Sequence, residues 1–334
     1  MAPLTWDECM WRLLHPGVGR HNSRVTEQVP TLDAGAADTP QFARDIAAAY
    51  AEYGFVIIRN HGIDKAVIDH CLDCFHRFFA LPVETKMRYK IPNGGGARGY
   101  TPFGVETAKD SKHHDLKEFW HVGRELPPGH PFNALMAPNV WVEEIPGFRE
   151  STLSLYRSFD ALGARLLSAI ARSVALPPNF FDDKVNLGNS VLRIIHYPPL
   201  PPEPTPSVRA GAHEDINVIT LLLGAEEPGL EVLTRSGHWL AVNPPAGSLV
   251  CNVGDMLQRL TNKHLRSTTH RVTNPARERA SNARYSLPFF LHFNPDFLIK
   301  TLPQYVDAQH PDEFPVPINS HDFLQERLRE IKLI

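Results

Sequence analysis

The second half of the sequence consists of short β-rich runs that Pro, Gly and Asn residues separate. From Ser190 onward the runs are VLRIIHYP, INVITLLLGA, GLEVLTRSG, HWLAVNPPAG, SLVCNVGDMLQRLTN, STTHRVTNP and RYSLPFFLHFNPD. Runs of this kind between turn-forming residues predict strands. Many short, evenly spaced strands favour a sandwich or a barrel, because these folds close the edges of their sheets. We therefore predict a mainly β core from about residue 180 to residue 300.

The first half of the chain predicts helices. Residues 39–53, TPQFARDIAAAYAEY, repeat apolar positions at helical spacing behind a Thr N-cap. A second helix is expected over residues 64–89, with a break at Pro82, and the longest over residues 148–176. We expect an α+β protein in which an N-terminal helical layer embraces one barrel.

Four regions follow from this pattern. Residues 1–28 are a poorly patterned extension, and residues 29–178 hold the helical layer and the loops over the barrel mouth. Residues 179–300 form the barrel, and residues 301–334 form a tail with a short helix in SHDFLQERLREIKL.

The composition gives no reason to expect nucleic acid or membrane as a partner. Charged residues make up 21% of the chain, the formal net charge is −3, and no apolar run approaches the length that spans a bilayer. Four cysteines do not resemble a secreted disulfide framework, so we expect a cytoplasmic protein. Cys71 and Cys74 share a helix face, and we expect both to be buried there. The glycines of GGGARG follow a helix, which argues against a dinucleotide loop.

The stretch GAHEDINVIT, residues 211–220, places polar residues at the start of an apolar run. If it is a strand, His213 and Asp215 face one side and Glu214 faces the other. His270, in STTHRV, would complete a set of two histidines and one carboxylate. Such a set suits non-haem Fe(II) and leaves one face of the metal open. Because the chain has 17 histidines, this pattern alone also arises by chance.

A second motif follows shortly after His270. Arg284 and Ser286, in RYSLPFF, share a strand face and would form a receptor for a carboxylate. Arg279 and Ser281 have the same spacing. We favour the later pair because SLPFFLHF continues as a strand, whereas ARERASNA is a polar loop.

With these motifs the chain resembles the iron(II)/2-oxoglutarate-dependent dioxygenases, in particular their isopenicillin N synthase-like branch. The matching motifs are TLD…AAYAEYGFVIIRNHGI, IIHYPP, H-E-D, NVGDMLQRLTN, His270 followed by Arg-Val, and R-Y-S running into LPFF. The resemblance covers about residues 29–300. It implies a double-stranded β-helix, the jelly-roll barrel of the cupins, with flanking N-terminal helices.

The resemblance also implies a cofactor set of Fe(II), 2-oxoglutarate and O2. The implied metal ligands are His213, Asp215 and His270. The implied anchors of 2-oxoglutarate are Arg284, Ser286 and Tyr197. The family's common Asn before that tyrosine is Ile195 here, so the cosubstrate pocket differs in detail. 2-Oxoglutarate would leave as succinate and CO2, and hydroxylation of the substrate is expected, although desaturation, ring closure and epoxidation use the same ligands.

Substrate contacts are expected from the loops and strands around the barrel mouth. The candidates are Arg98, Tyr100, Phe119, Trp120, Asn217, Phe290 and His292. Each has a plainer alternative, such as a solvated loop for Arg98 and core packing for Phe119 and Trp120. The substrate is expected to be a small molecule such as an amino acid, a small peptide or a natural-product intermediate.

Two other functions remain open at this point. One is an oxidase like isopenicillin N synthase, which takes all four electrons from its substrate and needs no 2-oxoglutarate. The other is a barrel that binds partners without a working metal site, and the complete set of implied ligands argues against it.

Overall fold

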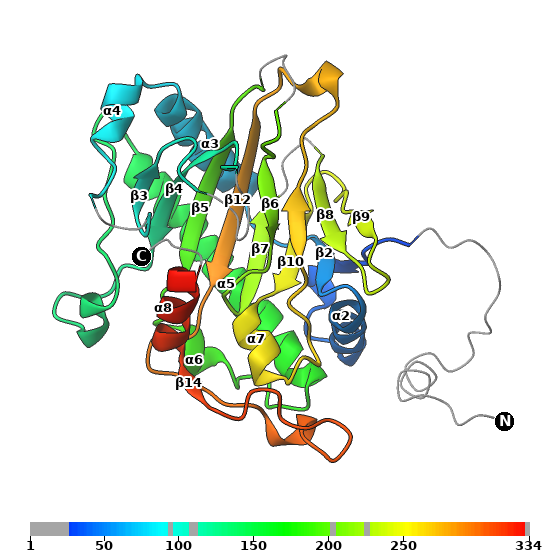
Figure 1. Cartoon of the computed structure of the whole chain (residues 1–334). Coiled ribbons are helices and arrows are strands. Elements are labelled where there is room, and N and C mark those ends of the chain that lie inside the picture. The colour runs from blue at the N-terminus through cyan, green and yellow to red at the C-terminus, as the bar shows by residue number, and fades with distance from the viewer. Residues whose placement is uncertain (1–26, 93–95, 107–112, 201–204, 224–227, 331–334) are drawn as a thin grey trace.

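The computed structural model describes residues 27–92, 96–106, 113–200, 205–223 and 228–330 (Figure 1). The extension predicted at residues 1–28 lies outside the described residues except for its last two positions. The described chain has three β-sheets: two large ones, with helices on one side of the larger, and a two-stranded sheet near the C-terminal end of the described residues.

The larger sheet has eight strands in the order β1-β2-β10-β7-β12-β5-β4-β3, and only β1 and β2 pair in parallel. The strands are β1 (Thr31–Asp33), β2 (Phe55–Arg59), β3 (Gly99–Thr101), β4 (Glu118–Gly123), β5 (Val191–Tyr197), β7 (Ile219–Leu223), β10 (Leu249–Val253) and β12 (Arg284–Leu291). The N-terminal region therefore supplies both edges of this sheet. The division predicted between residues 178 and 179 stays a prediction.

The smaller sheet has four strands in the order β6-β11-β8-β9. The strands are β6 (Ala210–His213), β8 (Leu230–Leu233), β9 (Trp239–Ala241) and β11 (His270–Val272). One hydrophobic cluster joins Phe55 and Val250 of the larger sheet to Leu230 and Val232 of the smaller one, so the two sheets face each other. This is the jelly-roll arrangement with a helical layer that the sequence predicts, built from two sheets instead of one closed cylinder.

Three helices cover the outer face of the larger sheet: α2 (Pro40–Glu52), α3 (Lys65–Phe79) and α5 (Phe148–Ser173). In Figure 1 α5 runs behind the strands. Phe159 of α5 stacks on Phe289 of β12 with ring centroids 5.4 Å apart. A Cβ on Gly163 would lie 2.4 Å from Leu291, so the glycine permits this close approach.

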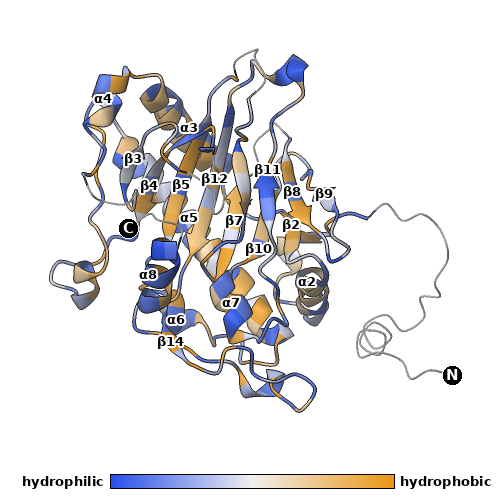
Figure 2. Ribbon diagram, in the orientation of Figure 1, coloured by the Kyte–Doolittle hydropathy of each residue, from blue (hydrophilic) through white to orange (hydrophobic). Residues whose placement is uncertain are grey.

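The helix predicted over residues 64–89 is divided near Pro82, as expected, into α3 and α4 (Val83–Met87). Cys71 and Cys74 are both buried in α3, which confirms their predicted place. The remaining α-helices and strands are α6 (Asp182–Val185), α7 (Asp255–Leu260), β13 (Leu298–Ile299), β14 (Ile318–Asn319) and α8 (Ser320–Glu330), and the described residues also form 3-10 helices at Ala34–Ala36, Pro131–Ala134, Arg277–Arg279 and Pro303–Tyr305. Figure 2 shows hydrophobic residues concentrated in the strands, while α8 is largely hydrophilic.

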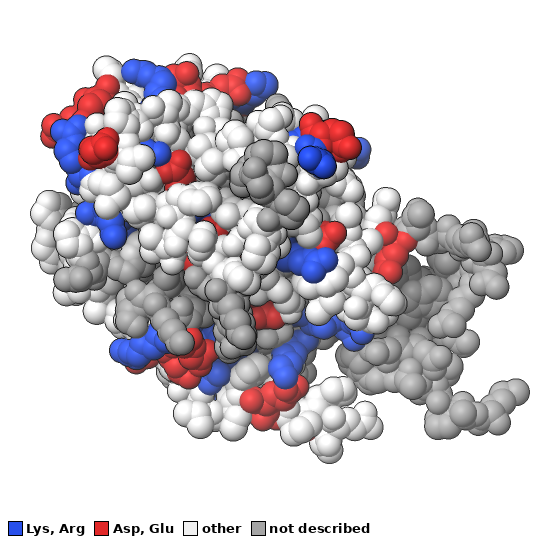
Figure 3. All heavy atoms as spheres, turned by 45° about the horizontal axis from the view of Figure 1, so that its top comes forward, with Lys and Arg blue, Asp and Glu red and all other residues white. Residues whose placement is uncertain are grey.

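Among the described residues, no helix combines the length and the apolar character that crossing a membrane requires. On the face that Figure 3 shows, acidic and basic side chains are interspersed.

Candidate metal centre

His213 and His270 lie side by side on the smaller sheet. His213 is the last residue of β6, His270 is the first residue of β11, and the two are directly paired across the antiparallel strands. Their ring centroids are 4.4 Å apart. The pairing explains how two histidines that are distant in sequence reach one point.

Asp215 reaches the same point from a loop. The strand predicted through residues 211–220 is interrupted, because β6 ends at His213 and β7 begins at Ile219. Asp215 lies in between, where the chain crosses from the smaller sheet to the larger one. The strand alternation predicted for His213 and Asp215 was therefore wrong, although both side chains do converge.

Among the described residues, those that donate hydrogen bonds to the Asp215 carboxylate all reach it through Oδ2. Its Oδ2 accepts hydrogen bonds from Thr220 Oγ1 at 2.6 Å and from Asn252 Nδ2 at 2.8 Å. Asn217, a candidate substrate contact, donates to Ile219 O at 2.6 Å and to Thr220 Oγ1 at 3.1 Å, so it supports this arrangement. Asp215 Oδ1 is left facing the histidines.

Both histidines have their Nε2 atoms directed at Asp215. His213 Nδ1 lies 2.8 Å from Gly211 O, and His270 Nδ1 lies 3.1 Å from Thr268 O. A carbonyl oxygen only accepts hydrogen bonds, so each Nδ1 carries a hydrogen, and the neutral form of each ring has its lone pair on Nε2. Each Nε2 lies 3.9 Å from Asp215 Oδ1.

The surroundings of His213 and Asp215 favour the protonation states that a metal needs. Burial, and then His270, lowers the pKa of His213 to about 4, so its imidazole is neutral at pH 7. Burial alone would raise the pKa of Asp215, but the two histidines and its hydrogen bonds lower it, so the carboxylate is ionised. Glu214, in contrast, is exposed and accepts a hydrogen bond from Thr269 Oγ1.

The three donor atoms lie within 4.8 Å of one another, and no other group of His, Cys, Asp and Glu in the described part of the chain could hold a metal in this way. Two imidazole nitrogens and one carboxylate oxygen are the donor set of open non-haem Fe(II) sites. The residues therefore fit Fe(II).

Arg284 and Ser286 lie buried at the start of β12. Leu287, Phe289 and Leu291 of this strand pack against the helices, so the even-numbered residues face the interior between the sheets. Arg284 is paired with Tyr197 of β5, and its guanidinium carbon lies 5.0 Å from the centre of the tyrosine ring.

Arg279, the first residue of the alternative R-x-S pair, is the last residue of a 3-10 helix. It therefore lies outside the sheets. Ile195 is paired with Ser286 and clusters with Phe119 and Tyr197. Ile195 therefore makes apolar contacts at the position where the dioxygenase family commonly has the amide of an asparagine.

Comparison with known proteins gives the family. Residues 188–293 match the model of the 2OG-Fe(II) oxygenase superfamily, and residues 29–144 match the model of the N-terminal region of non-haem dioxygenases in morphine synthesis. The chain belongs to the 2OG-Fe(II) oxygenase superfamily. It is a 2-oxoglutarate-dependent dioxygenase, and this family uses Fe(II), 2-oxoglutarate and O2.

Three similar proteins illustrate the match. A crystal structure of a 2OG-Fe(II) oxygenase family protein of Caulobacter crescentus shares 54% identity and a TM-score of 0.84, and covers 90% of this chain and 98% of that one. A full-length Neurospora crassa protein crystallised in complex with alpha-KG and thymine shares 28% identity and a TM-score of 0.79, over 90% of this chain and 96% of that one. The proline hydroxylase buaE of Petromyces alliaceus is 34% identical, over 86% of this chain and 92% of the relative.

The dioxygenase also has a buried charge cluster beside its histidines. Lys117 Nζ lies 2.6 Å from Glu106 Oε2 and 2.9 Å from Asp115 Oδ2. The other oxygen of Asp115 accepts from Gly211 N at 3.0 Å, and Gly211 O in turn orients His213. Although burial favours their neutral forms, mutual attraction raises the pKa of Lys117 and, together with Arg193, lowers that of Glu106.

Sequence reasoning missed Thr220, Asn252 and Lys117. Thr220 lies in ITLLL and Asn252 in LVCNV, and each is a polar residue inside an apolar strand. That interruption was the available signal. For Lys117 the signal was the alternation of charges in DLKE.

The substrate candidates divide between the two faces of the larger sheet. Phe119 and Phe290 lie on the inner face, where Arg193 contacts both rings. Tyr100 and Trp120 lie on the outer face, in the aromatic core beneath α3 and α5. The enzyme's structure thus does not bring Tyr100 and Trp120 to the metal centre. Their strand positions face the helices, and we no longer count them as substrate contacts.

Arg98 is not a solvated loop arginine, because only 2% of its surface is exposed. Its guanidinium donates to Asn189 Oδ1 at 2.7 Å and to Ala97 O at 2.7 Å. It also packs on Gly123, where a Cβ would lie 1.9 Å from Arg98 Nη2. Burial lowers its pKa to about 10.

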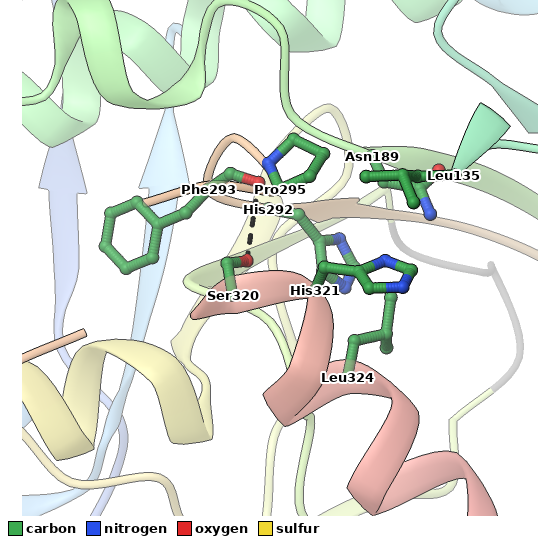
Figure 4. A pocket seen from close by; sticks show the side chains of 8 residues that line it. All are labelled: Leu135, Asn189, His292, Phe293, Pro295, Ser320, His321 and Leu324. Carbon is green, nitrogen blue, oxygen red and sulfur yellow. Dashed lines mark hydrogen bonds between the residues drawn. The ribbon is translucent and has the colours of Figure 1, made fainter. Parts of the chain in front are cut away.

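His292 follows the end of β12 and lines a small cavity beside α8 (Figure 4). Its Nδ1 lies 3.0 Å from Phe290 O, and burial lowers its pKa to about 4. The cavity is lined by Leu135, Asn189, His292, Phe293, Pro295, Ser320, His321 and Leu324. Its walls thus combine the end of the barrel with the C-terminal helix.

Proposed function

We propose that the dioxygenase hydroxylates a small molecule at a single Fe(II) held by His213, Asp215 and His270. The observation that carries this proposal is the convergence of two Nε2 lone pairs on one free carboxylate oxygen, with both Nδ1 atoms tied to backbone carbonyls. Arg284 and Ser286 then bind the distal carboxylate of 2-oxoglutarate, and the Tyr197 ring supports the arginine.

Fe(II) held by these residues would activate O2, which oxidises 2-oxoglutarate to succinate and CO2 with one oxygen atom and the substrate with the other. The chain supplies position and protonation. Thr220 and Asn252 keep Asp215 ionised and fixed through Oδ2. Asp115 fixes the backbone that orients His213. Burial of Asp215, His270 and Arg284 limits the access of water.

Two observations support a small polar substrate: the compounds named for related proteins, and the side chains on the inner face of the larger sheet. One relative is a proline hydroxylase and another has been crystallised with thymine, and both ligands are compact rings with acceptor oxygens. The inner face beside the metal carries charged and aromatic side chains together, namely Lys117, Arg193, Phe119 and Phe290.

The test is 2-oxoglutarate turnover on a panel of amino acids, pyrimidines and other small rings. The wild type should form succinate in proportion to oxidised product, and His270→Ala should form none. His310→Ala, at an exposed histidine far along the chain, is the matched control and should keep wild-type turnover. Oxygen uptake with substrate but without 2-oxoglutarate would contradict the proposal and favour a four-electron oxidase.

A further inference from the structure

The start of helix α7 holds the loop that carries Asp215. Because this loop lies between β6 and β7, its carbonyl oxygens need hydrogen-bond donors other than a neighbouring strand. The backbone N–H groups of residues 254–256 supply them, at distances of 2.9, 2.7 and 3.1 Å. The donor and acceptor pairs are Gly254 with Val218, Asp255 with Asp215 and Met256 with Asn217. The metal-ligand loop therefore rests directly on the backbone of α7.

The contact between α7 and this loop is close, and it extends toward a second metal ligand. A Cβ on Gly254 would lie 2.1 Å from Asn217 O, so the approach requires glycine. Further along α7, Gln258 Oε1 accepts a hydrogen bond from Ser267 N at 2.9 Å. The next residue, Thr268, has the carbonyl that orients His270. A displacement of α7 would thus disturb the chain around both Asp215 and His270.

Helix α8 packs against α7, and both lie at the same end of the larger sheet (Figure 1). Ser320 Oγ donates to Met256 Sδ at 3.5 Å. The Phe323 ring lies 5.9 Å from the guanidinium carbon of Arg259. Residues 320, 323 and 327 are three and four positions apart, so they share one face of α8. That face is directed at α7.

Arg327 makes the contact of this face that is nearest to the metal-ligand loop. Its Nη2 lies 3.4 Å from Asp255 Oδ2, and the two side chains are 25% and 12% exposed. Its Nη1 lies 2.6 Å from Glu330 Oε2, which fixes the orientation of the guanidinium. Because neither partner is freely exposed, solvent and salt screen this ion pair less than a surface pair. Asp255 is also the residue whose backbone N–H binds Asp215 O.

Apolar burial contributes little to the docking of α8. The helix is largely hydrophilic (Figure 2), and Ser320 is its one buried residue in the described part of the chain. Phe323 and Leu324 are only partly buried against the core. The position of α8 on α7 therefore depends strongly on its polar contacts, and Arg327 makes the ionic one.

We propose that Arg327 is a positioning residue for the metal centre, which acts through Asp255 on the first turn of α7 and so on the Asp215 loop. Docking of α8 and binding of iron then favour each other, because a coupling between two sites is reciprocal. This inference rests on the proposed function, since it concerns the iron that Asp215 and His270 hold.

The experiment measures the affinity of the full chain for Fe(II) by equilibrium dialysis without oxygen, with 2-oxoglutarate present. The variants are Arg327→Gln, Arg327→Lys, Asp255→Asn and the double variant of Arg327→Gln with Asp255→Asn. The matched control is Arg329→Gln, which changes an exposed arginine of the same helix. Urea denaturation of each apoprotein identifies conditions in which all variants are folded.

Arg327→Gln should weaken Fe(II) binding by about 3-fold to 30-fold, while the control keeps the wild-type affinity. Asp255→Asn should cause a similar loss. The double variant should lose no more than either single variant, because both changes remove one contact. Arg327→Lys should recover part of the affinity, since it restores the positive charge.

Hydrogen exchange supplies a second measurement, which a purely structural arginine would not affect. In the wild type, Fe(II) should slow the exchange of backbone amides in residues 320–330 as well as in residues 254–260. Arg327→Gln should lose the iron-dependent protection of α8. The wild-type measurement tests the coupling even if a variant fails to fold.

Four results would overturn the inference. They are wild-type iron affinity in folded Arg327→Gln, an equal loss in Arg329→Gln, additive losses in the double variant, and no effect of iron on exchange in α8 of the wild type. A wild type that binds no Fe(II) would instead refute the proposed function itself.

Discussion

The two faces of strands β4, β5 and β12 have opposite chemistry. The outer face packs Trp120, Phe289 and Ile194 against the helices, and its charged residue Glu118 is satisfied locally by Lys86 at 2.8 Å. The inner face carries Arg193, Arg284 and Ser286, which alternate along β5 and β12 with the residues that pack against the helices. One strand therefore serves stability with one set of alternate residues and chemistry with the other.

This difference predicts that neighbouring residues respond to substitution in different ways. Changes on the outer face should lower the free energy of unfolding and leave the binding constants of the folded enzyme unchanged. Changes on the inner face should do the reverse.

The largest effect is expected at Trp120, which is fully buried among Phe75, Phe78 and Phe148. Trp120→Ala should lower the free energy of unfolding by about 3–5 kcal/mol, because it leaves a large cavity. Urea denaturation of the apoprotein measures this loss, and the KM for 2-oxoglutarate should stay at the wild-type value. A raised KM for 2-oxoglutarate in the folded variant would contradict the assignment of stability to the outer face and of binding to the inner face.

Arg284→Gln is the matching change on the inner face. It should weaken the binding of 2-oxoglutarate by about 100-fold, because a charged donor to a carboxylate is removed. Fluorescence or calorimetric titration with Fe(II) present checks the value. If Arg279→Gln, at the competing R-x-S position, lost as much affinity, the assignment of the anchor would be wrong.

Asn252→Ala tests whether a residue on the inner face of the larger sheet also holds the Asp215 carboxylate in place. The variant loses the 2.8 Å hydrogen bond to Asp215 Oδ2. Iron affinity should fall by about 10-fold, within the range known for groups that orient metal ligands. Equilibrium dialysis against Fe(II) without oxygen measures it, and unchanged affinity would show that Thr220 alone suffices.

His292 gives a smaller effect that depends on pH. Its pKa in the folded protein is about 4, below its ordinary value, chiefly because it is buried. As pH falls from the ordinary histidine range toward 4, the unfolded chain binds a proton that the folded chain does not, so stability falls. His292→Gln removes this contribution, and the apoprotein should lose less stability over that interval in urea titrations at several pH values. Parallel curves for variant and wild type would contradict the assigned pKa.

Much of this arrangement could be predicted from the sequence. Turn residues between β-rich runs predicted the strands, and helical spacing predicted α2 and α5. The strand after Arg284 distinguished that residue from Arg279. Contacts between distant segments could not be predicted, because pairing of His213 with His270 and the approach of Asn252 to Asp215 depend on sheet register.

The substrate candidates show the same limit. Phe119 and Trp120 are adjacent aromatic residues of similar hydrophobicity. The sequence alone therefore does not predict which of them faces the helices. Register with β5 decides it, since Phe119 is opposite Ile195 and Trp120 is opposite Ile194 of the outer core.

The central claim is that one carboxylate of the HED motif binds iron and its neighbour does not. Anaerobic titration of the apoprotein with Fe(II) in the presence of 2-oxoglutarate, with bound iron counted after dialysis, tests it directly. Wild type and Glu214→Gln should each retain one iron per chain, and Asp215→Ala should retain none. Equal loss of iron in Glu214→Gln and Asp215→Ala, or full retention in Asp215→Ala, would contradict the account.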